Sequence, residues 1–185
     1  MTRTVSPAGR ALLLAREGCR LAAYRDSTGV PTIGVGHTGR ASPPAVTMGM
    51  EITRGEAEAF LAADLAPFEA AVAGAVPATL TQNQFDACVS LAFNIGAHGF
   101  VGSTVVHKLT AGDRAGAADA FLMWVHPPEL AGRRRAERAQ FLRPDDTAPD
   151  PASTAAAPLA GPHLLPVAQP GLWARILAAL TRKAT

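Results

Sequence analysis

The stretch EGCRLAAYRDSTGVPTIGVGHTG, residues 17–39, decides the fold because its patterning changes from helical to strand-like. Over residues 21–37 apolar positions alternate with small or polar ones, on both sides of the turn sequence STG at 27–29. This alternation predicts a β-hairpin. Its second strand, expected over residues 32–37, places Ile33 and Val35 on one face and Thr32 with two glycines on the other. Because glycines weaken a strand, we expect a ligand or another backbone to approach the glycine face closely.

Helix signals dominate the rest of residues 1–143. Ser6 followed by Pro7 indicates a helix start, and Gly18 suits the left-handed residue that ends a helix. Capping-box spacings begin at Thr53 and Thr81 and open two apolar periodic stretches. The predicted helices cover residues 7–17, 54–73, 82–95, 104–110, 113–125 and 129–142. The sequence therefore predicts an α+β fold that is mostly α.

Composition excludes several classes of protein. The 185 residues suit one globular domain with something left over, and a formal net charge of +2 provides no strong field for binding nucleic acid. Cys19 and Cys88 stand in no CxxC spacing, so we interpret both as small core residues. The apolar run at 11–15 is too short for a signal peptide or a membrane span. We therefore expect the protein to begin in the cytoplasm.

The composition changes after residue 143. Residues 144–170 are rich in proline and alanine, which predicts a linker between a domain at 1–143 and the final segment, GLWARILAALTRKAT at 171–185. Apolar residues at helical spacing and three basic residues make this segment a predicted cationic amphipathic helix. It is too short to cross a bilayer. Ordering on an anionic membrane surface and docking on the domain both remain open.

Two carboxylates and a hydroxyl are predicted to surround the hairpin. Glu17 ends the first helix, Asp26 lies beside the hairpin turn on the same strand face as Tyr24, and Thr32 faces the groove expected there. Cleavage of a polysaccharide uses such a pair, in which one carboxyl donates a proton and the other stays ionised. The negative end of the helix dipole favours the protonated form of Glu17, while the polar turn favours ionised Asp26. Taken singly, each residue has an ordinary structural interpretation.

The stretch at 17–39 resembles the signature of the phage lysozymes of glycoside hydrolase family 24, and the likeness continues at 90–100, 103–109 and 132–142. The resemblance implies a lysozyme-like fold, with a small β-hairpin lobe and a helical lobe flanking a cleft. It also implies hydrolysis of the β-1,4 bond between N-acetylmuramic acid and N-acetylglucosamine in peptidoglycan, without cofactor or metal. Glu17 would be the proton donor, Asp26 the nucleophile or base, and Thr32 the holder of the attacking water.

Four further residues are candidates for binding substrate. In related enzymes an arginine of the C-terminal basic helix approaches the catalytic glutamate, which favours Arg134 within the triplet at 133–135, although a solvated basic face explains the triplet equally well. Tyr24 lies near the carboxylates. Asn94 suits a sugar amide or a backbone cap, and Trp124 suits the cleft or the core. His37 is expected to be buried and hydrogen-bonded rather than catalytic.

A zinc peptidase and a non-catalytic binding protein are the competing functions. A zinc peptidase would need clustered ligands, but the histidines form no HExxH or similar pairing. A non-catalytic protein that binds peptidoglycan and permeabilises membranes remains the alternative. The absence of a recognisable export signal leads us to expect a monomeric phage or prophage endolysin. It would stay in the host cytoplasm until a separate holin gives it access to the periplasmic cell wall.

Overall fold

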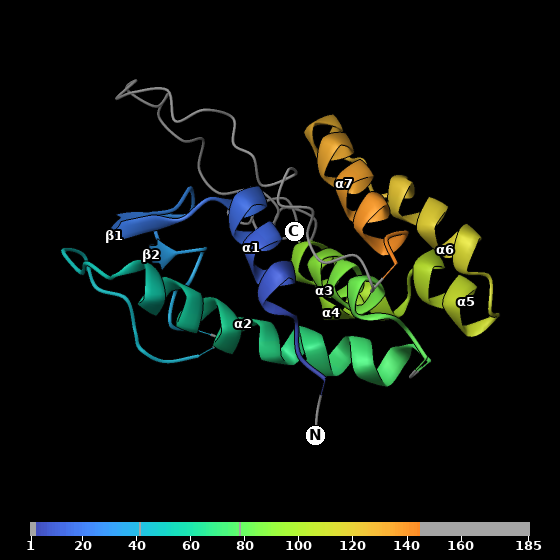
Figure 1. Cartoon of the computed structure of the whole chain (residues 1–185). Coiled ribbons are helices and arrows are strands. Elements are labelled where there is room, and N and C mark those ends of the chain that lie inside the picture. The colour runs from blue at the N-terminus through green and yellow to red at the C-terminus, as the bar shows by residue number, and fades with distance from the viewer. Residues whose placement is uncertain (1–2, 41, 78, 145–185) are drawn as a thin grey trace, which may run out of the picture. The chain divides into compact units, whose positions relative to one another are not determined.

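The computed structural model describes residues 3–40, 42–77 and 79–144. The predicted linker beyond Pro144 and the segment at 171–185 lie outside the described residues. In chain order the helices and strands are α1 (Pro7–Glu17), β1 (Arg20–Arg25), β2 (Pro31–Gly34), α2 (Arg54–Ala75), α3 (Gln82–Ile95), α4 (Ala97–Val101), α5 (Thr104–Thr110), α6 (Arg114–Ala120), the 3-10 turns η1 (Phe121–Met123) and η2 (Pro128–Leu130), and α7 (Ala131–Phe141) (Figure 1). The predicted α+β class, mostly α, is confirmed. No helix of the described part is long and apolar enough to span a membrane.

The described chain divides into two compact units. The hairpin unit comprises residues 17–61, and the helical unit comprises residues 3–16 and 62–144, apart from positions 41 and 78. Both α1 and α2 start in one unit and end in the other. The last residue of α1, Glu17, therefore belongs to the hairpin unit, together with Asp26 and Thr32.

The hairpin unit holds β1 and β2 beside the first turns of α2 (Figure 1). The strands are antiparallel, and Tyr24 lies opposite Thr32 in their register. Beneath them four apolar residues form a core to which both the loop and α2 contribute: Ile33, Val46, Ile52 and Ala57. The half-buried Cys19 packs against this core, as the sequence predicts.

The predicted second strand is too long, because β2 ends at Gly34. The backbone instead folds into a tight turn in which Ile33 and His37 exchange two N–H to carbonyl hydrogen bonds, each 2.9 Å long. Gly34 and Gly36 adopt φ values of 62° and 87°, which other residues rarely take. A Cβ on Gly34 would lie 3.6 Å from that of Ala57, which confirms the expected close approach of another backbone, here that of α2.

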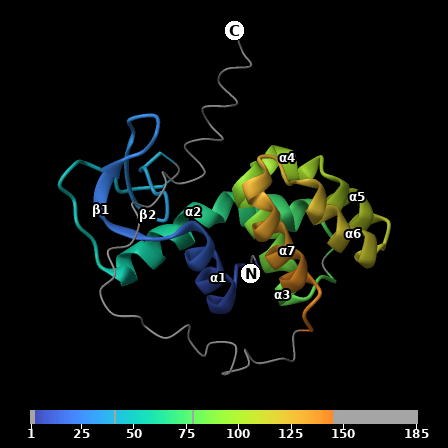
Figure 2. The same cartoon turned by 90° about the horizontal axis from the view of Figure 1, so that it is seen from above.

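The helical unit is built around α3, whose residues 85–94 are all buried. The elements α3, α4, α5, α6 and α7 gather together (Figure 2). The predicted capping box at Thr81 is confirmed: its hydroxyl accepts from the Gln84 amide, and the Gln84 side chain accepts from the Thr81 amide. Ser6 likewise caps α1 by accepting a 3.0 Å bond from the amide of Gly9.

Two predicted helices of this unit need correction, and a third helix was not predicted. The helix expected to reach residue 125 ends at Ala120 and continues only as the short turn η1, because the backbone leaves helical geometry at Trp124 and two prolines follow. The final basic helix begins as the turn η2 and is α-helical only from Ala131. Sequence reasoning also missed α4, a five-residue helix without a side-chain cap.

Candidate active site

Asp26 is fixed by the hairpin turn. Its Oδ1 atom accepts three hydrogen bonds, from the Thr28 amide at 2.8 Å, the Thr28 hydroxyl at 2.7 Å and the Val30 amide at 2.9 Å. Partial burial works to raise the pKa of Asp26, but these bonds and the nearby positive charge of Arg40 outweigh it, so the pKa lies below its usual value. Asp26 is therefore ionised at neutral pH, as the sequence predicts.

Thr32 is buried, with 3% of its surface exposed. Its hydroxyl donates to the Val30 carbonyl at 3.0 Å. Because the hydroxyl hydrogen is committed to this bond, only the oxygen lone pairs are left to hold a further group, and they can accept a hydrogen from water. β2 therefore places Thr32 under cover rather than on an exposed strand face.

Tyr24 connects the two carboxylates electrostatically. Burial raises the pKa of the Tyr24 phenol, the charge of Arg20 opposes this, and the negative charges of Asp26 and Glu17 add to it. The Arg20 guanidinium lies 4.1 Å from the centre of the Tyr24 ring, in a cation–π contact. Both carboxylates and this phenol belong to the hairpin unit.

A second polar group lies inside the helical unit, at the buried end of α3. Arg134 on α7 is fully buried and donates to Oε2 of Glu137, to Oδ1 of Asn94 and, at 3.1 Å, to the carbonyl of Trp124. A solvated basic face is therefore the wrong interpretation of Arg134. The proposed backbone cap at Asn94 is also wrong, because the free groups at that helix end are carbonyls, to which only the amide nitrogen of Asn94 could donate. The Asn94 amide nitrogen is buried and has no hydrogen-bond partner among the described residues.

Glu137 organises this buried group. Its Oε1 atom accepts from the Ser90 hydroxyl at 2.6 Å and from Arg133 at 2.9 Å, while Oε2 serves Arg134. A charge that is fully buried is sustained by several directed bonds of this kind. Sequence reasoning missed Glu137, although its spacing of three and four residues after two arginines was a usable signal.

The remaining candidates have less specific surroundings. Trp124 is half-buried and lies outside any helix, so neither the helix-borne nor the fully buried interpretation fits it. His37 is buried, its Nε2 lies 2.9 Å from the Pro44 carbonyl, and its ring packs on Phe60, which confirms the predicted structural role. Cys88 is buried, and burial raises the pKa of its thiol; both cysteines are free.

The hairpin unit thus combines three groups with complementary chemistry. A glutamate ends a helix, an aspartate is held ionised by a turn, and a threonine oxygen is left as an acceptor. A proton donor, a carboxylate and a water-holding oxygen are the groups required to hydrolyse a glycosidic bond. Together with the mostly helical fold, they define the class of lysozyme-like glycoside hydrolases.

Comparison with known proteins agrees with this class. The family model described as phage lysozyme matches residues 15–137. The endolysin of Salmonella phage P22 is 47% identical over 142 residues, which cover 75% of this chain and 97% of the relative. A crystal structure of P22 lysozyme superposes with a TM-score of 0.72 at 46% identity, covering 76% of this chain and 99% of that one. The chain belongs to the phage lysozyme family.

A solved structure outside the phage endolysins is also similar. The muramidase domain of SpmX from Asticaccaulis excentricus superposes with a TM-score of 0.68 at 37% identity, and the match covers 77% of this chain and 99% of that domain. The family match, at residues 15–137, includes parts of both units. It does not extend over the full 185 residues of this chain.

Proposed function

We propose that this protein is an endolysin that hydrolyses the β-1,4 bond between N-acetylmuramic acid and N-acetylglucosamine in peptidoglycan and so lyses bacteria. The observation that supports the proposal most is that the hairpin turn holds Asp26 through three hydrogen bonds to one carboxylate oxygen, in the same unit as Glu17 and Thr32. Family membership supports the same chemistry.

The three groups divide the reaction between them. Glu17, protonated, donates its proton to the glycosidic oxygen as the bond to the anomeric carbon breaks. Asp26, ionised by its turn, either attacks the anomeric carbon or takes a proton from the attacking water. Thr32 accepts a hydrogen bond from that water, which leaves the water oxygen's lone pair available for attack. The products are a new reducing end and a new non-reducing end.

Four further residues are proposed to contribute to substrate binding. Tyr24, held by Arg20, offers a ring edge and a hydroxyl to a sugar. Asn94 carries a buried amide hydrogen donor that suits an N-acetyl carbonyl. Trp124 offers an aromatic face, on which sugars stack, and Arg134 is proposed to approach Glu17 and stabilise its ionised form after proton transfer.

The setting of the reaction is also part of the proposal. The enzyme acts on the cell wall as a monomer, and it resides in the host cytoplasm until a separate holin opens the inner membrane. Residues 171–185, which lie outside the described residues, are proposed to bind an anionic membrane surface through their basic and apolar side chains.

The chemical nature of the ends released from purified peptidoglycan tests the function. A muramidase releases reducing ends, which borohydride converts to muramitol. Release of free amino groups instead would indicate an amidase or peptidase. Binding to the wall without new ends would indicate the non-catalytic alternative, and either of these two results would overturn the proposal.

A further inference from the structure

The last turn of α1 bears a second charged residue next to Glu17. Arg16 donates from Nη1 to the Ser90 hydroxyl on α3 at 3.1 Å, and from Nη2 to Oε1 of Gln140 on α7 at 2.8 Å. All three residues belong to the helical unit. One guanidinium therefore ties the C-terminal turn of α1 to two other helices.

We propose that Arg16 is a positioning residue for Glu17. By clamping the last turn of α1 onto α3 and α7, it fixes the backbone from which the proton-donating carboxyl projects. The inference rests on the proposed function, because it assigns Arg16 a part in the same reaction. Arg16 itself touches no substrate in this account.

The end of α1 needs such a clamp. The final four carbonyls of a helix have no partner within the helix, and terminal turns open at little free-energy cost. After Glu17 the chain passes through Gly18 at φ 75°, where an added Cβ would meet no atom within 4 Å. The glycine after Glu17 therefore adds no side-chain packing to the end of α1.

The acceptors of the clamp are themselves fixed. Ser90 is 1% exposed and donates its single hydroxyl hydrogen to Glu137 at 2.6 Å, so its lone pairs face the donor on Arg16. Gln140 is 3% exposed. Because Glu137 also binds Arg134, one set of bonds runs from the residue before Glu17 to the arginine proposed to approach it.

The geometry requires arginine and not only a positive charge. A guanidinium presents separate nitrogens in a rigid plane, so two of them reach acceptors on two helices at once. The ammonium group of lysine is a single nitrogen on a flexible stem. The substitution Arg16→Lys therefore keeps the charge beside Glu17 but loses the two-helix clamp.

Steady-state kinetics on soluble, uncross-linked glycan strands test the inference, with the full chain in each case. For Arg16→Met and Arg16→Lys we expect kcat to fall on the order of 10- to 100-fold, with KM changed less than about twofold, because a misplaced donor slows the chemical step more than binding. The control is Arg10→Met. Arg10 lies on the same helix, and its hydrogen bond at 2.6 Å goes to the Val5 carbonyl and not to a residue of α3 or α7.

Two neutral variants cover the case in which loss of Arg16 prevents folding. Ser90→Ala and Gln140→Leu each remove one acceptor without changing charge, and each should lower kcat with a loss that is not additive to that of Arg16→Met. Folded clamp variants whose kcat stays within about twofold of Arg10→Met would overturn the inference.

Amide hydrogen exchange separates this inference from the proposed function. Exchange at residues 14–17 should quicken in Arg16→Met and stay unchanged in Arg10→Met. If the wild-type chain releases no reducing ends, the proposed function fails whatever the exchange shows. If it releases them and exchange at 14–17 is unchanged in Arg16→Met, the inference alone fails.

Discussion

The amide of Val30 donates a 2.9 Å hydrogen bond to Oδ1 of Asp26, across the hairpin turn. This oxygen also accepts both bonds from Thr28, so one atom of the carboxylate is held by the turn. No hydrogen bond from a described residue occupies Oδ2, which makes Oδ2 the atom that faces the reaction in our account.

Removing one of these bonds should change the pH profile. Because the pKa of Asp26 is lowered in the folded protein, its ionised form stabilises the turn at neutral pH, and this contribution is lost as the pH falls through that lowered pKa. Thr28→Val removes the hydroxyl bond and raises the pKa, so the acid limb of kcat should move to higher pH. Ser27→Ala, exposed and outside the bonds to Asp26, is the control. An acid limb at the same pH in Thr28→Val and Ser27→Ala would contradict this assignment.

Two glycines of the hairpin unit should differ in their tolerance of alanine. Both have positive φ, but a Cβ on Gly39 would lie 2.5 Å from the Cα of Ala45, whereas one on Gly49 would meet nothing within 4 Å. We expect Gly49→Ala to cost about 1–2 kcal/mol in unfolding free energy from backbone strain alone, and Gly39→Ala distinctly more. Denaturant titration measures both. Equal losses would show that the loop at 39–45 yields to the added methyl group.

The buried carboxylate of Glu137 on α7 should contribute more to the free energy of unfolding than the exposed carboxylate of Asp119 on α6. Glu137→Gln leaves Arg134 buried with a weakened counter-charge, which should cost up to about 3–5 kcal/mol. The matched control is Asp119→Asn, which breaks the ion pair with Arg138, whose side chains are 65% and 38% exposed, and should cost about 0–1 kcal/mol. Similar values for the two variants would refute the role given to Glu137.

Local signals account for the parts of the fold that the sequence predicts well. The start of α1 at Ser6 and the start of α3 at Thr81 follow from caps whose partners lie within a few residues. The hairpin and the ionised state of Asp26 also depend on neighbours close in the chain. These are cases in which the interacting groups stand side by side in the sequence.

Features that depend on distant partners were not predictable. The turn at Gly34 requires a positive φ of 62°, and a period-two pattern alone extends the strand through it. Arg134 belongs to a run of three arginines, a pattern that is typical of a solvent-exposed face. It is nevertheless buried, and its guanidinium donates to Asn94 on α3 and to Glu137 on its own helix. The clamp by Arg16 likewise depends on Gln140, far along the chain.

The terminal segment is predicted to bind membranes. The full chain should bind vesicles containing anionic lipid more tightly than a chain ending at Pro144, which keeps the carbonyl that Asn83 binds at 3.1 Å. Neutral vesicles are the control, because they offer no negative charge to the basic residues at 171–185. On these vesicles only the apolar residues of the segment can favour binding. Equal binding of the two chains to anionic vesicles would remove the segment from the account.

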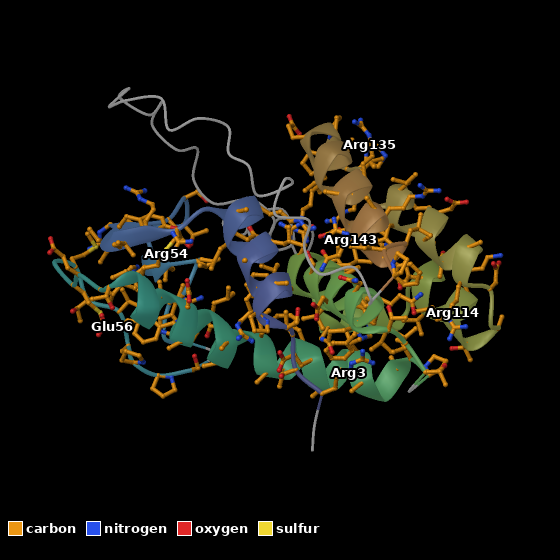
Figure 3. The ribbon with its side chains drawn as sticks, viewed as in Figure 1. Arg3, Arg54, Glu56, Arg114, Arg135 and Arg143 are labelled. Atoms are coloured by element: carbon orange, nitrogen blue, oxygen red, sulfur yellow. The ribbon has the colours of Figure 1, made fainter. Side chains whose placement is uncertain are left out.

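Exposed charges of the helical unit offer a check on that experiment. Figure 3 shows Arg135 at the surface of α7, and Arg143 follows the same helix. If these two residues account for vesicle binding, Arg135→Gln with Arg143→Gln will lower it in both chains alike. We expect the double variant to leave the difference between the two chains intact.

Reducing-end release by Glu17→Gln and Asp26→Asn tests the central claim most directly. Each change replaces a carboxyl by an amide of the same shape, so each variant should fold and lower kcat by about 10²- to 10⁴-fold, while Asp26→Asn should also lower the melting temperature because the ionised form of Asp26 stabilises its turn. Glu56→Gln is the control, since this exposed residue of the Thr53 capping box tolerates either side chain. We predict that Glu17→Gln and Asp26→Asn lose turnover and that Glu56→Gln keeps it. Wild-type turnover in a folded Glu17→Gln or Asp26→Asn protein would contradict the assignment of the reaction to this pair.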